Sequence, residues 1–406
     1  MARPTFVILG AGLCGAAAAQ ALREEGFDGS LILLGEEPHL SYERPPLSKE
    51  YLRGEQGRDE LFVHPEAWYA EQDIDVRLGV RATAIDLGER SVALSDDERL
   101  GFDSLLIATG GRPRRLSDEP AERVLYLRTI EDCDRIRKVV SPGMRLVVVG
   151  AGFIGVEVTA SARAGGAEVT CLSSTDVPLA DVLGPEIGRL YAEIHREHGV
   201  DLRGGARVES IEETGDQVVI RTTDDDVVEG DAVVVGVGIQ PNVELAEAAG
   251  LELTNGIAVD ERCQTSHEGV FAAGDVADHL HPVFGRRIRV EHFDNAIKQG
   301  TNAARNMLGK LEPFDDPHWF WSDQYEYNLQ YGGFAYEWDQ VEVRGSLDER
   351  DFLAFFLKDG VLLAALGLNR GRDVRRAMKL IAARAHPDPQ QLRDADVDLR
   401  TLIPKE

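Results

Sequence analysis

Two glycine-rich segments carry the clearest chemistry in the sequence, and they lie 140 residues apart. In a G-x-G-x-x-G motif the first glycine permits a tight turn, the second admits a pyrophosphate, and the third lets a helix pack on a strand. The free N–H groups and the positive end of that helix favour phosphate groups. The motif glycines are Gly10, Gly12 and Gly15, then Gly150, Gly152 and Gly155. The sequence therefore predicts two dinucleotide sites.

The segments around each motif predict the elements that must position it. Apolar strand-like runs at 5–9 and 146–149 precede the motifs, helical stretches to about Glu25 and Ala164 follow, and second strands are expected at 31–34 and 168–172. These are two βαβ units. Alternating runs at 82–86 with 91–94, and at 207–212 with 218–222, predict small antiparallel sheets. Strand-to-glycine segments at 105–110 and 232–238 close both halves.

The last quarter of the chain has a different composition. Strand-like runs at 340–344, 351–357 and 361–366 precede a helix expected at about 373–384, which predicts an α+β domain. Proline-containing stretches at 111–121, with Pro113 and Pro120, and at 313–317 are expected to cross between domains. An aromatic cluster opens this part of the chain: Trp319, Trp321, Tyr325, Tyr327 and Tyr331.

Acidic residues at strand ends add a second kind of signal. Glu36 follows the strand at 31–34, where an acid is expected to bind an adenosine ribose. Asp275 follows the apolar run at 270–273 and Gly274, where a carboxylate can bind a ribityl hydroxyl. Together with Thr109 and Gly110, these residues favour a flavin nucleotide at the first site.

Bulk composition limits the classes of function. A chain of 406 residues predicts two or three domains, and no apolar run reaches the ~18 residues that a membrane span needs. The net charge of −27 argues against nucleic acid or an anionic membrane as a partner. Residues 1–22 imitate a signal peptide, but the glycine motif explains them better, so we expect a cytoplasmic protein. Only seven of the 44 basic residues are lysines, which fits either a GC-rich genome or a salt-adapted host.

The cysteines argue against thiol chemistry. None of them form a CxxC pair, which fits a reducing compartment without a disulfide framework. Disulfide reductases with two dinucleotide sites carry a redox cysteine pair after the first strand pair, where this chain has Tyr42-Glu43-Arg44-Pro45-Pro46. No metal-ligand cluster is recognisable either. The cysteines are Cys14, Cys133, Cys171 and Cys263.

The ordered motifs GAGLCG, RPPLSK, ATGGRPR, GAGFIGVE, VGVGIQPN, AAGDVAD and WFWSDQY resemble those of the ferredoxin reductases of oxygenase systems. The resemblance covers nearly the whole chain, and RPPLSK and WFWSDQY are its most specific parts. It implies an α/β fold like that of glutathione reductase, with two Rossmann-like domains and a C-terminal α+β domain. The expected FAD-binding domain comprises 1–112 and 241–315, the NAD(P)H-binding domain 113–240, and the C-terminal domain 316–406.

The resemblance also assigns residues to the two nucleotides. It implies that Lys49 and Glu157 lie near the flavin and nicotinamide and pair with each other, and that Trp321 lies where electrons leave. These three are the candidate catalytic residues. The candidates for FAD are Gly10, Gly12, Gly15, Glu36, Arg44, Pro46, Lys49, Val80, Thr109, Gly110, Arg128, Gly274, Asp275 and Trp321. The candidates for NAD are Gly150, Gly152, Gly155, Glu157, Ser173 and Gly238.

The chain departs from its relatives at two positions. Phe293 stands where many of them have tryptophan, and Ser173 stands where an acid would grip the 2′-hydroxyl of NADH. No arginine follows before Arg189, so the usual partner of the NADPH 2′-phosphate is also missing. We therefore expect NADH to be used with weak discrimination, with NADPH possible. Asp176 would add NADH preference if its loop folds back, and Arg203 would favour NADPH if it reaches the ribose.

The predicted activity is electron transfer from NADH through FAD to a small iron–sulfur ferredoxin. A flavin bridges these partners because it accepts two electrons together and releases them singly. Two other functions stay open: direct reduction of a quinone or a radical such as monodehydroascorbate, and a nucleotide-switched flavoprotein resembling apoptosis-inducing factor. The oligomeric state is open between a monomer and a weak dimer. The expected dock for an acidic ferredoxin is a basic cluster around the last long helix, comprising Arg370, Arg372, Arg375, Arg376, Lys379 and Arg384.

Overall fold

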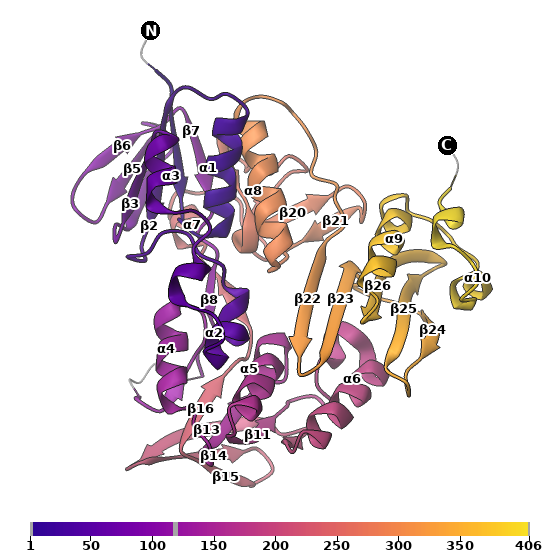
Figure 1. The fold of residues 1–406 in the computed structure, drawn as a ribbon. Helices are drawn as coiled ribbons and strands as arrows, with labels where there is room; N and C mark the ends of the chain where they lie inside the picture. The colour runs from indigo at the N-terminus through magenta and orange to yellow at the C-terminus, as the bar shows by residue number, and fades with distance from the viewer. Residues whose placement is uncertain (1–2, 117–120, 405–406) are drawn as a thin grey trace.

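A five-stranded parallel sheet holds the first glycine motif (Figure 1). The computed structural model describes residues 3–116 and 121–404, so Pro120 of the expected crossover lies outside the described residues. The strand order β3-β2-β1-β7-β19 places β1 at the centre, where neighbouring connections diverge. Ligands of open α/β sheets bind at this kind of switch point. The strands are β1 (Thr5–Leu9), β2 (Ser30–Gly35), β3 (Ile74–Leu78), β7 (Ser104–Ile107) and β19 (Val270–Ala272).

Both faces of this sheet are buried, as its continuous apolar strands require. Ile8 and Leu33 face one core with the helices α1 (Leu13–Glu24) and α8 (Phe293–Met307). The alternate residues Val7 and Ile32 face a second core. That core is closed by the small sheet of β4 (Ala82–Asp86), β5 (Ser91–Leu94) and β6 (Arg99–Gly101). The connections of this half of the chain also contain the short helices α2 (Glu50–Arg53), α3 (Glu66–Glu71) and α7 (Glu244–Ala248), with the 3-10 turns η1 (Pro45–Ser48), η2 (Arg58–Leu61) and η3 (Gly274–Val276).

A second parallel sheet repeats the arrangement, with the order β12-β11-β10-β16-β9. Leu146 and Val148 face a core shared with α5 (Phe153–Ala164), whereas Val147 and Val149 face the small sheet β13-β14-β15. The two predicted βαβ units are therefore confirmed. The strands are β9 (Val124–Leu125), β10 (Arg145–Val149), β11 (Glu168–Leu172), β12 (Asp201–Arg203), β13 (Val208–Thr214), β14 (Gln217–Thr222), β15 (Val227–Gly230) and β16 (Ala232–Val235). The other helices are α4 (Ile130–Val139) and α6 (Ala180–Glu197), the latter interrupted at Gly184.

Two antiparallel strands carry the chain between the parallel sheets. β8 (Gly111–Pro113) leaves the first sheet and pairs with β17 (Ile239–Pro241), which returns from the second. The expected crossover at 111–121 thus begins as a strand beside its return connection. A further sheet of β18 (Ile257–Val259), β20 (Ala277–His281) and β21 (Arg286–Ile288) lies next to α8 (Figure 1).

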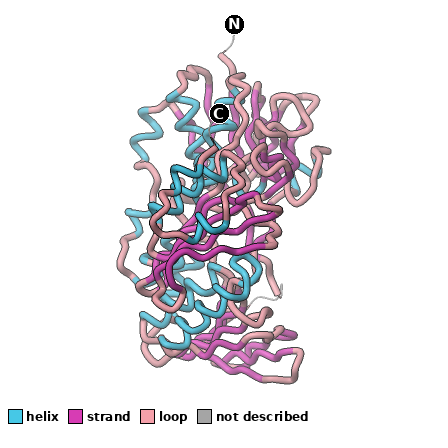
Figure 2. The backbone as a smooth tube through the Cα atoms, turned by 90° about the vertical axis from the view of Figure 1, so that its right-hand side faces the viewer, coloured by secondary structure: helices cyan, strands magenta, loops and turns pink. Residues whose placement is uncertain are grey.

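The C-terminal part is an antiparallel sheet of order β22-β23-β26-β25-β24, which faces the viewer in Figure 2. The aromatic cluster forms the hairpin β22 (Trp319–Gln324) and β23 (Tyr327–Gly333), which the sequence did not predict as strands. The remaining elements are β24 (Gln340–Ser346), β25 (Asp351–Lys358), β26 (Val361–Leu368), α9 (Gly371–Ala382), α10 (Pro389–Arg393) and η4 (Leu399–Leu402). The expected α/β fold with a C-terminal α+β domain is confirmed.

The helix α9 begins and ends about two residues earlier than predicted. Val374, Ala377, Leu380 and Ile381 pack it on the sheet, leaving its basic face exposed. Arg384 has a φ of 48° and follows the helix, so the predicted extent to Arg384 was wrong.

Candidate active site between two dinucleotide folds

The geometry of both glycine motifs fits a nucleotide. A Cβ atom added at Gly10 would lie 2.2 Å from the carbonyl oxygen of Ala108, and one at Gly15 would lie 2.0 Å from that of Gly10. Packing against the protein therefore requires both glycines. An added Cβ at Gly12 meets no atom of the described residues within 4 Å, although its backbone begins α1. Gly12 leaves the helix N-terminus open, as a bound pyrophosphate needs.

The second motif has the same geometry. A Cβ atom at Gly150 would lie 2.3 Å from the carbonyl oxygen of Gly236, and one at Gly155 would lie 1.9 Å from that of Gly150. An added Cβ at Gly152, at the start of α5, again has no neighbour within 4 Å in the part of the chain that the structure describes. Gly238 has a φ of 96°, a conformation that favours glycine. The two motifs thus form two nucleotide-binding cradles with the same backbone geometry.

Charged side chains gather around the first cradle. Arg128 donates a hydrogen bond to Asp275 Oδ2 at 2.8 Å, and Arg44 donates to Glu37 Oε1 at 2.6 Å. Arg44 also donates to the carbonyl oxygen of Arg128, so its guanidinium group lies against the Arg128 backbone. Arg289 donates to the backbone oxygen of Asp275 at 3.1 Å. The structure therefore brings the predicted residues Arg44, Arg128 and Asp275 into one cluster with cations suited to phosphates.

The other candidates for FAD line the ends of the same sheet. Glu36 is exposed at the carboxyl end of β2, and the backbone N–H of Val80 donates to Gly35 at 3.0 Å. Thr109 donates to the carbonyl oxygen of Asn242 at 2.9 Å, which fixes the loop after β7. Gly110 and Gly274 have φ values of 63° and 77°, respectively. These positions surround the carboxyl edge of the first sheet.

The RPPLSK segment folds so that Lys49 points away from solvent. Pro45 and Pro46 start the 3-10 turn η1, because proline fixes a φ suited to the first helical positions. Lys49 then links η1 to α2, and its side chain is only 6% exposed. A lysine held this deeply needs a charged partner.

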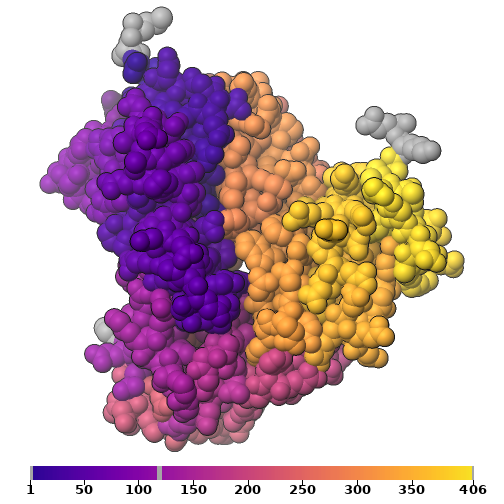
Figure 3. All heavy atoms as spheres, in the orientation of Figure 1, coloured from indigo at the N-terminus to yellow at the C-terminus, as the bar shows by residue number. Residues whose placement is uncertain are grey.

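Glu157 in α5 is that partner. Lys49 Nζ donates to Glu157 Oε2 at 2.6 Å, and Ser48 Oγ donates to the same oxygen at 2.6 Å. Ser322 Oγ of β22 donates to Glu157 Oε1 at 2.7 Å. The carboxylate thereby connects the RPPLSK segment, the second βαβ unit and the C-terminal sheet. The implied pairing of Lys49 with Glu157 is confirmed, and Figure 3 shows the surface hollowed where these three parts meet.

Aromatic side chains cluster on β22 and at the start of α8. Trp321 stacks on Trp319 with ring centroids 5.3 Å apart, and its edge meets Phe293 at 5.5 Å. The guanidinium of Arg375 on α9 lies 5.8 Å from the Trp319 ring centroid. Phe293, the substituted position, therefore belongs to the same aromatic group as the predicted Trp321.

Ser173 lies at the end of β11 as predicted, but its side chain is buried. Its Oγ lies 3.0 Å from Thr175 Oγ1, and its backbone N–H donates to the carbonyl oxygen of Arg203. The loop after Ser173 packs on the turn that follows β12, because Gly205 donates to the Thr175 carbonyl oxygen at 3.0 Å and the backbone of Asp176 lies against Gly204. Arg203 is engaged with Asp201 at 2.8 Å.

Reasoning from sequence missed four residues of the site. Ser48 and Ser322 bind the Glu157 carboxylate, and Glu37 and Arg289 join the charged cluster. Glu37 follows the predicted Glu36 directly, so its position at the end of the strand could have identified it as a site residue. A serine carries no comparable pattern, and only the three-dimensional contact identifies Ser48 and Ser322.

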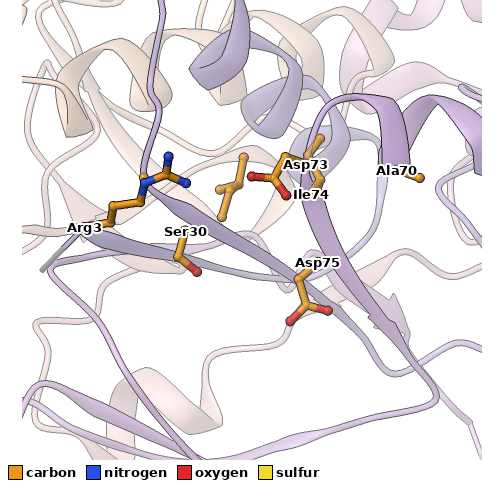
Figure 4. A pocket seen from close by; sticks show the side chains of 8 residues that line it. Arg3, Ser30, Ala70, Asp73, Ile74 and Asp75 are labelled. Atoms are coloured by element: carbon orange, nitrogen blue, oxygen red, sulfur yellow. The ribbon is translucent and has the colours of Figure 1, made fainter.

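One cavity lies apart from this site. It has a volume of about 370 Å³ and lies at the amino ends of β2 and β3, lined by Arg3, Ser30, Asp73 and Asp75 (Figure 4). Both glycine motifs lie at the opposite, carboxyl edge of their sheets. This cavity contains none of the predicted site residues.

Two dinucleotide cradles joined by a buried lysine–glutamate pair define a nucleotide-dependent oxidoreductase. The family model described as pyridine nucleotide-disulphide oxidoreductase matches residues 4–300, and the model described as reductase C-terminal matches residues 319–403. The chain belongs to the pyridine nucleotide-disulphide oxidoreductase family, which confirms the resemblance seen in the sequence.

Among its relatives is the ferredoxin–NAD(+) reductase component of the anthranilate 1,2-dioxygenase system of Burkholderia cepacia. It is 40% identical over 99% of this chain and 100% of that protein. Putidaredoxin reductase of Pseudomonas putida is 37% identical, over 99% of this chain and 97% of its own. The solved covalent complex of putidaredoxin reductase with putidaredoxin contains a chain with a TM-score of 0.95 and 37% identity, with 99% of each chain covered.

Proposed function

We propose that this chain transfers electrons from NADH through bound FAD to a small iron–sulfur ferredoxin that serves an oxygenase of the cytochrome P450 or Rieske type. When bound, FAD supplies the conversion between a two-electron donor and a one-electron acceptor. The observation that carries the proposal is the buried Lys49–Glu157 pair, which joins both dinucleotide folds and touches the hairpin that bears Trp321. Relatives that match nearly the whole chain are named as a ferredoxin–NAD(+) reductase component and a putidaredoxin reductase.

The residues divide the work in this proposal. Gly12 and the guanidinium groups of Arg44 and Arg128 would hold the FAD pyrophosphate, and Asp275 would bind the ribityl chain. Lys49 would supply a positive charge to the bound flavin, which would favour the electron-rich reduced form. Glu157 orients Lys49 and the nicotinamide. Trp321 and Trp319 exclude water on the side that faces α9.

The domain division follows the same proposal. Residues 1–112 with 241–315 bind FAD, 113–240 bind the nicotinamide nucleotide, and 316–406 form the C-terminal domain; the paired connections β8 and β17 support the first two boundaries. Within the described residues, no helix is long and apolar enough to cross a membrane. We also propose a cytoplasmic location, which the four free and buried cysteines support.

Acceptor choice tests the proposed function. Steady-state turnover with NADH is measured against several [2Fe-2S] ferredoxins, quinones and oxygen. We expect at least one ferredoxin to be reduced much faster than every quinone. Rapid reduction of quinones, with every ferredoxin inert, would favour a direct flavin reductase instead.

The basic face of α9 is the proposed ferredoxin dock. Arg372, Arg375 and Lys379 are exposed there, whereas Arg370 pairs with Asp351 and Arg376 pairs with Asp373 at 2.7 Å. The predicted cluster is thus partly neutralised by carboxylates. A protein with a net charge of −27 needs such a local patch to attract an acidic partner.

Charge reversal tests this dock. The double substitution of Arg375→Glu and Arg376→Glu is expected to raise the KM for ferredoxin about tenfold at low salt, and less at high salt. Reduction of ferricyanide by NADH should stay unchanged. The matched control is Arg99→Glu, which changes an exposed charge on β6. Equal ferredoxin kinetics in wild type and double variant would place the dock elsewhere.

Nucleotide preference is expected to be weak. The buried Ser173 hydroxyl supplies no charge, and the ion pair with Asp201 occupies Arg203. One neutral hydrogen bond is worth only about 0.5–1.5 kcal/mol, so NADH should be preferred about tenfold or less. Ser173→Glu should sharpen the preference by repelling the 2′-phosphate of NADPH. The measurement is kcat/KM for both nucleotides at one salt concentration, and a thousandfold wild-type preference would contradict this explanation.

A further inference from the structure

A buried series of hydrogen bonds leads away from Glu157 toward the surface. Ser322 Oγ binds Glu157 Oε1, and Gln324 Nε2 donates to Ser322 Oγ at 3.0 Å. Gln324 Oε1 lies 3.0 Å from His195 Nε2. His195 Nδ1 in turn lies 3.0 Å from the Tyr325 hydroxyl. The series links α5, β22 and α6, and the proposed mechanism uses only its first residue.

The central side chains of this series are buried, so solvent does not compete for their hydrogen bonds. Ser322, Gln324 and His195 are 0%, 1% and 0% exposed, respectively. Water therefore cannot replace a lost partner without a change in packing, and each polar atom depends on its neighbour. A change at one end is expected to reach the other.

The chemistry of the groups fixes the direction of every hydrogen bond. A carboxylate only accepts, so Ser322 donates to Glu157 and accepts from the Gln324 amide N–H. The Gln324 oxygen then needs a donor, which is the Nε2–H of His195. Burial lowers the pKa of His195 to about 4, so the imidazole is neutral at pH 7 and its Nδ1 accepts from Tyr325. All donors along the series point toward Glu157.

The outer end is anchored on α6. Tyr325 lies at the tip of the β22–β23 hairpin with a φ of 54°, which is uncommon for a residue with a side chain. Its ring stacks on His198 with centroids 3.6 Å apart. His198 Nε2 lies 3.4 Å from a carboxylate oxygen of Glu326, the next residue in the turn. The hairpin tip is thus held on the C-terminal end of α6, where His195 lies in the last turn and His198 follows as the cap residue.

We propose that His195 is a positioning residue for the Lys49–Glu157 pair. Through this series of hydrogen bonds, the contact between the hairpin tip and α6 fixes the orientation of the Glu157 carboxylate. Without its N–H, the Gln324 amide can turn its oxygen toward Ser322, and the Ser322 hydroxyl then donates to Gln324 instead of Glu157. The carboxylate would keep only the two donors on Oε2. This role rests on the proposed function, because the pair matters for reaction at the flavin.

Two substitutions at one position separate this role from a purely structural one. In His195→Gln the side-chain amide nitrogen reaches the place of Nε2 and keeps the donor to Gln324. In His195→Asn the amide reaches only the place of Nδ1, so the contact with Tyr325 is kept and the donor to Gln324 is lost. We expect His195→Asn to slow anaerobic flavin reduction by NADH about tenfold, as one lost hydrogen bond to a charged network would. His195→Gln should stay within about twofold of wild type.

A second variant covers the case that His195→Asn does not fold. Tyr325→Phe keeps the stack on His198 and removes only the hydroxyl that donates to His195, so a loss of about two- to threefold is expected in the same step. The FAD dissociation constant of each apoprotein should rise in the order of the rate losses. Equal rates and equal FAD affinity in His195→Gln and His195→Asn would overturn the proposal.

The tautomer gives a readout that does not depend on activity. The ¹⁵N NMR spectrum of histidine-labelled holoprotein should show His195 protonated on Nε2 and unprotonated on Nδ1 at pH 7, with His195→Gln identifying the signal. Protonation on Nδ1, or on both nitrogens, would overturn the direction of the series. If no ferredoxin is reduced, the proposed function fails while this tautomer can still be measured, so the two failures remain distinguishable.

Discussion

Replacing Lys49 with methionine is expected to produce the largest single loss of function and stability. The substitution leaves the Glu157 carboxylate buried with only Ser48 and Ser322 as donors. Removing one partner of a buried ion pair costs about 3–5 kcal/mol, because the other charge stays in a poorly solvated place. We expect a protein that remains folded at room temperature, melts at a lower temperature, retains FAD poorly and is reduced more slowly by NADH.

A double-mutant cycle assigns this loss to the pair. Glu157→Gln alone leaves the ammonium group of Lys49 without its carboxylate, whereas the double variant of Lys49→Met and Glu157→Gln removes both charges. The double variant should be more stable than the sum of the single losses predicts, by about 1–3 kcal/mol. Its flavin reduction should nevertheless stay slow. Lys138→Met on the exposed face of α4 is the control. Additive losses, or wild-type flavin reduction in Lys49→Met, would reduce Lys49 to a turn residue.

Acidification from pH 7 to pH 5 is expected to destabilise the fold strongly. Burial lowers the pKa of His195, His279 and His292 to about 4, from an ordinary value near 6.5. In the unfolded chain the same imidazoles take up protons near pH 6.5, so the unfolded state binds more protons between pH 6.5 and pH 4. The stability that depends on neutral histidines is therefore fully present above pH 6.5 and is lost as the pH falls toward 4. At pH 5 the loss is on the order of 2 kcal/mol for each histidine.

One of the buried histidines allows a direct test of this acid sensitivity. His318 lies among Phe284, Phe314 and Phe334, and burial holds its pKa well below the ordinary value. Within the described residues, neither of its ring nitrogens has a hydrogen-bond partner. His318→Phe should therefore reduce the drop in the urea midpoint between pH 7 and pH 5. His386→Gln, at an exposed position, should leave the drop unchanged. A urea midpoint that does not change between pH 7 and pH 5 would contradict the coupling of histidine protonation to stability.

The fold was predictable where the sequence repeats a local rule. Gly10 and Gly150 each close a tight turn after an apolar strand, so β1 was predicted with its observed bounds and β10 to within one residue. The hairpin β22–β23 was not predicted, because its aromatic residues follow no simple alternation and its turn contains Tyr325 rather than glycine. The start of α9 was misplaced because no side chain caps the helix at Arg370.

The site was predictable only in part, for a related reason. Gly12 and Gly152 are identified by spacing, since the motif is local. The contact between Lys49 and Glu157 spans 108 residues and followed only from a resemblance to known reductases. Ser322 binds the same carboxylate from a third part of the chain, and no local pattern distinguishes it from other serines. Long-range polar contacts of this kind depend on how the domains assemble.

An anaerobic titration tests the central claim most directly. The purified protein should be yellow with one FAD per chain, and one equivalent of NADH should bleach it. Adding two equivalents of an oxidised [2Fe-2S] ferredoxin that it recognises should restore the flavin colour as the ferredoxin becomes reduced. A colourless protein that cannot be reconstituted with FAD, or a bleached protein that returns no electrons to any ferredoxin, would contradict the proposed electron transfer.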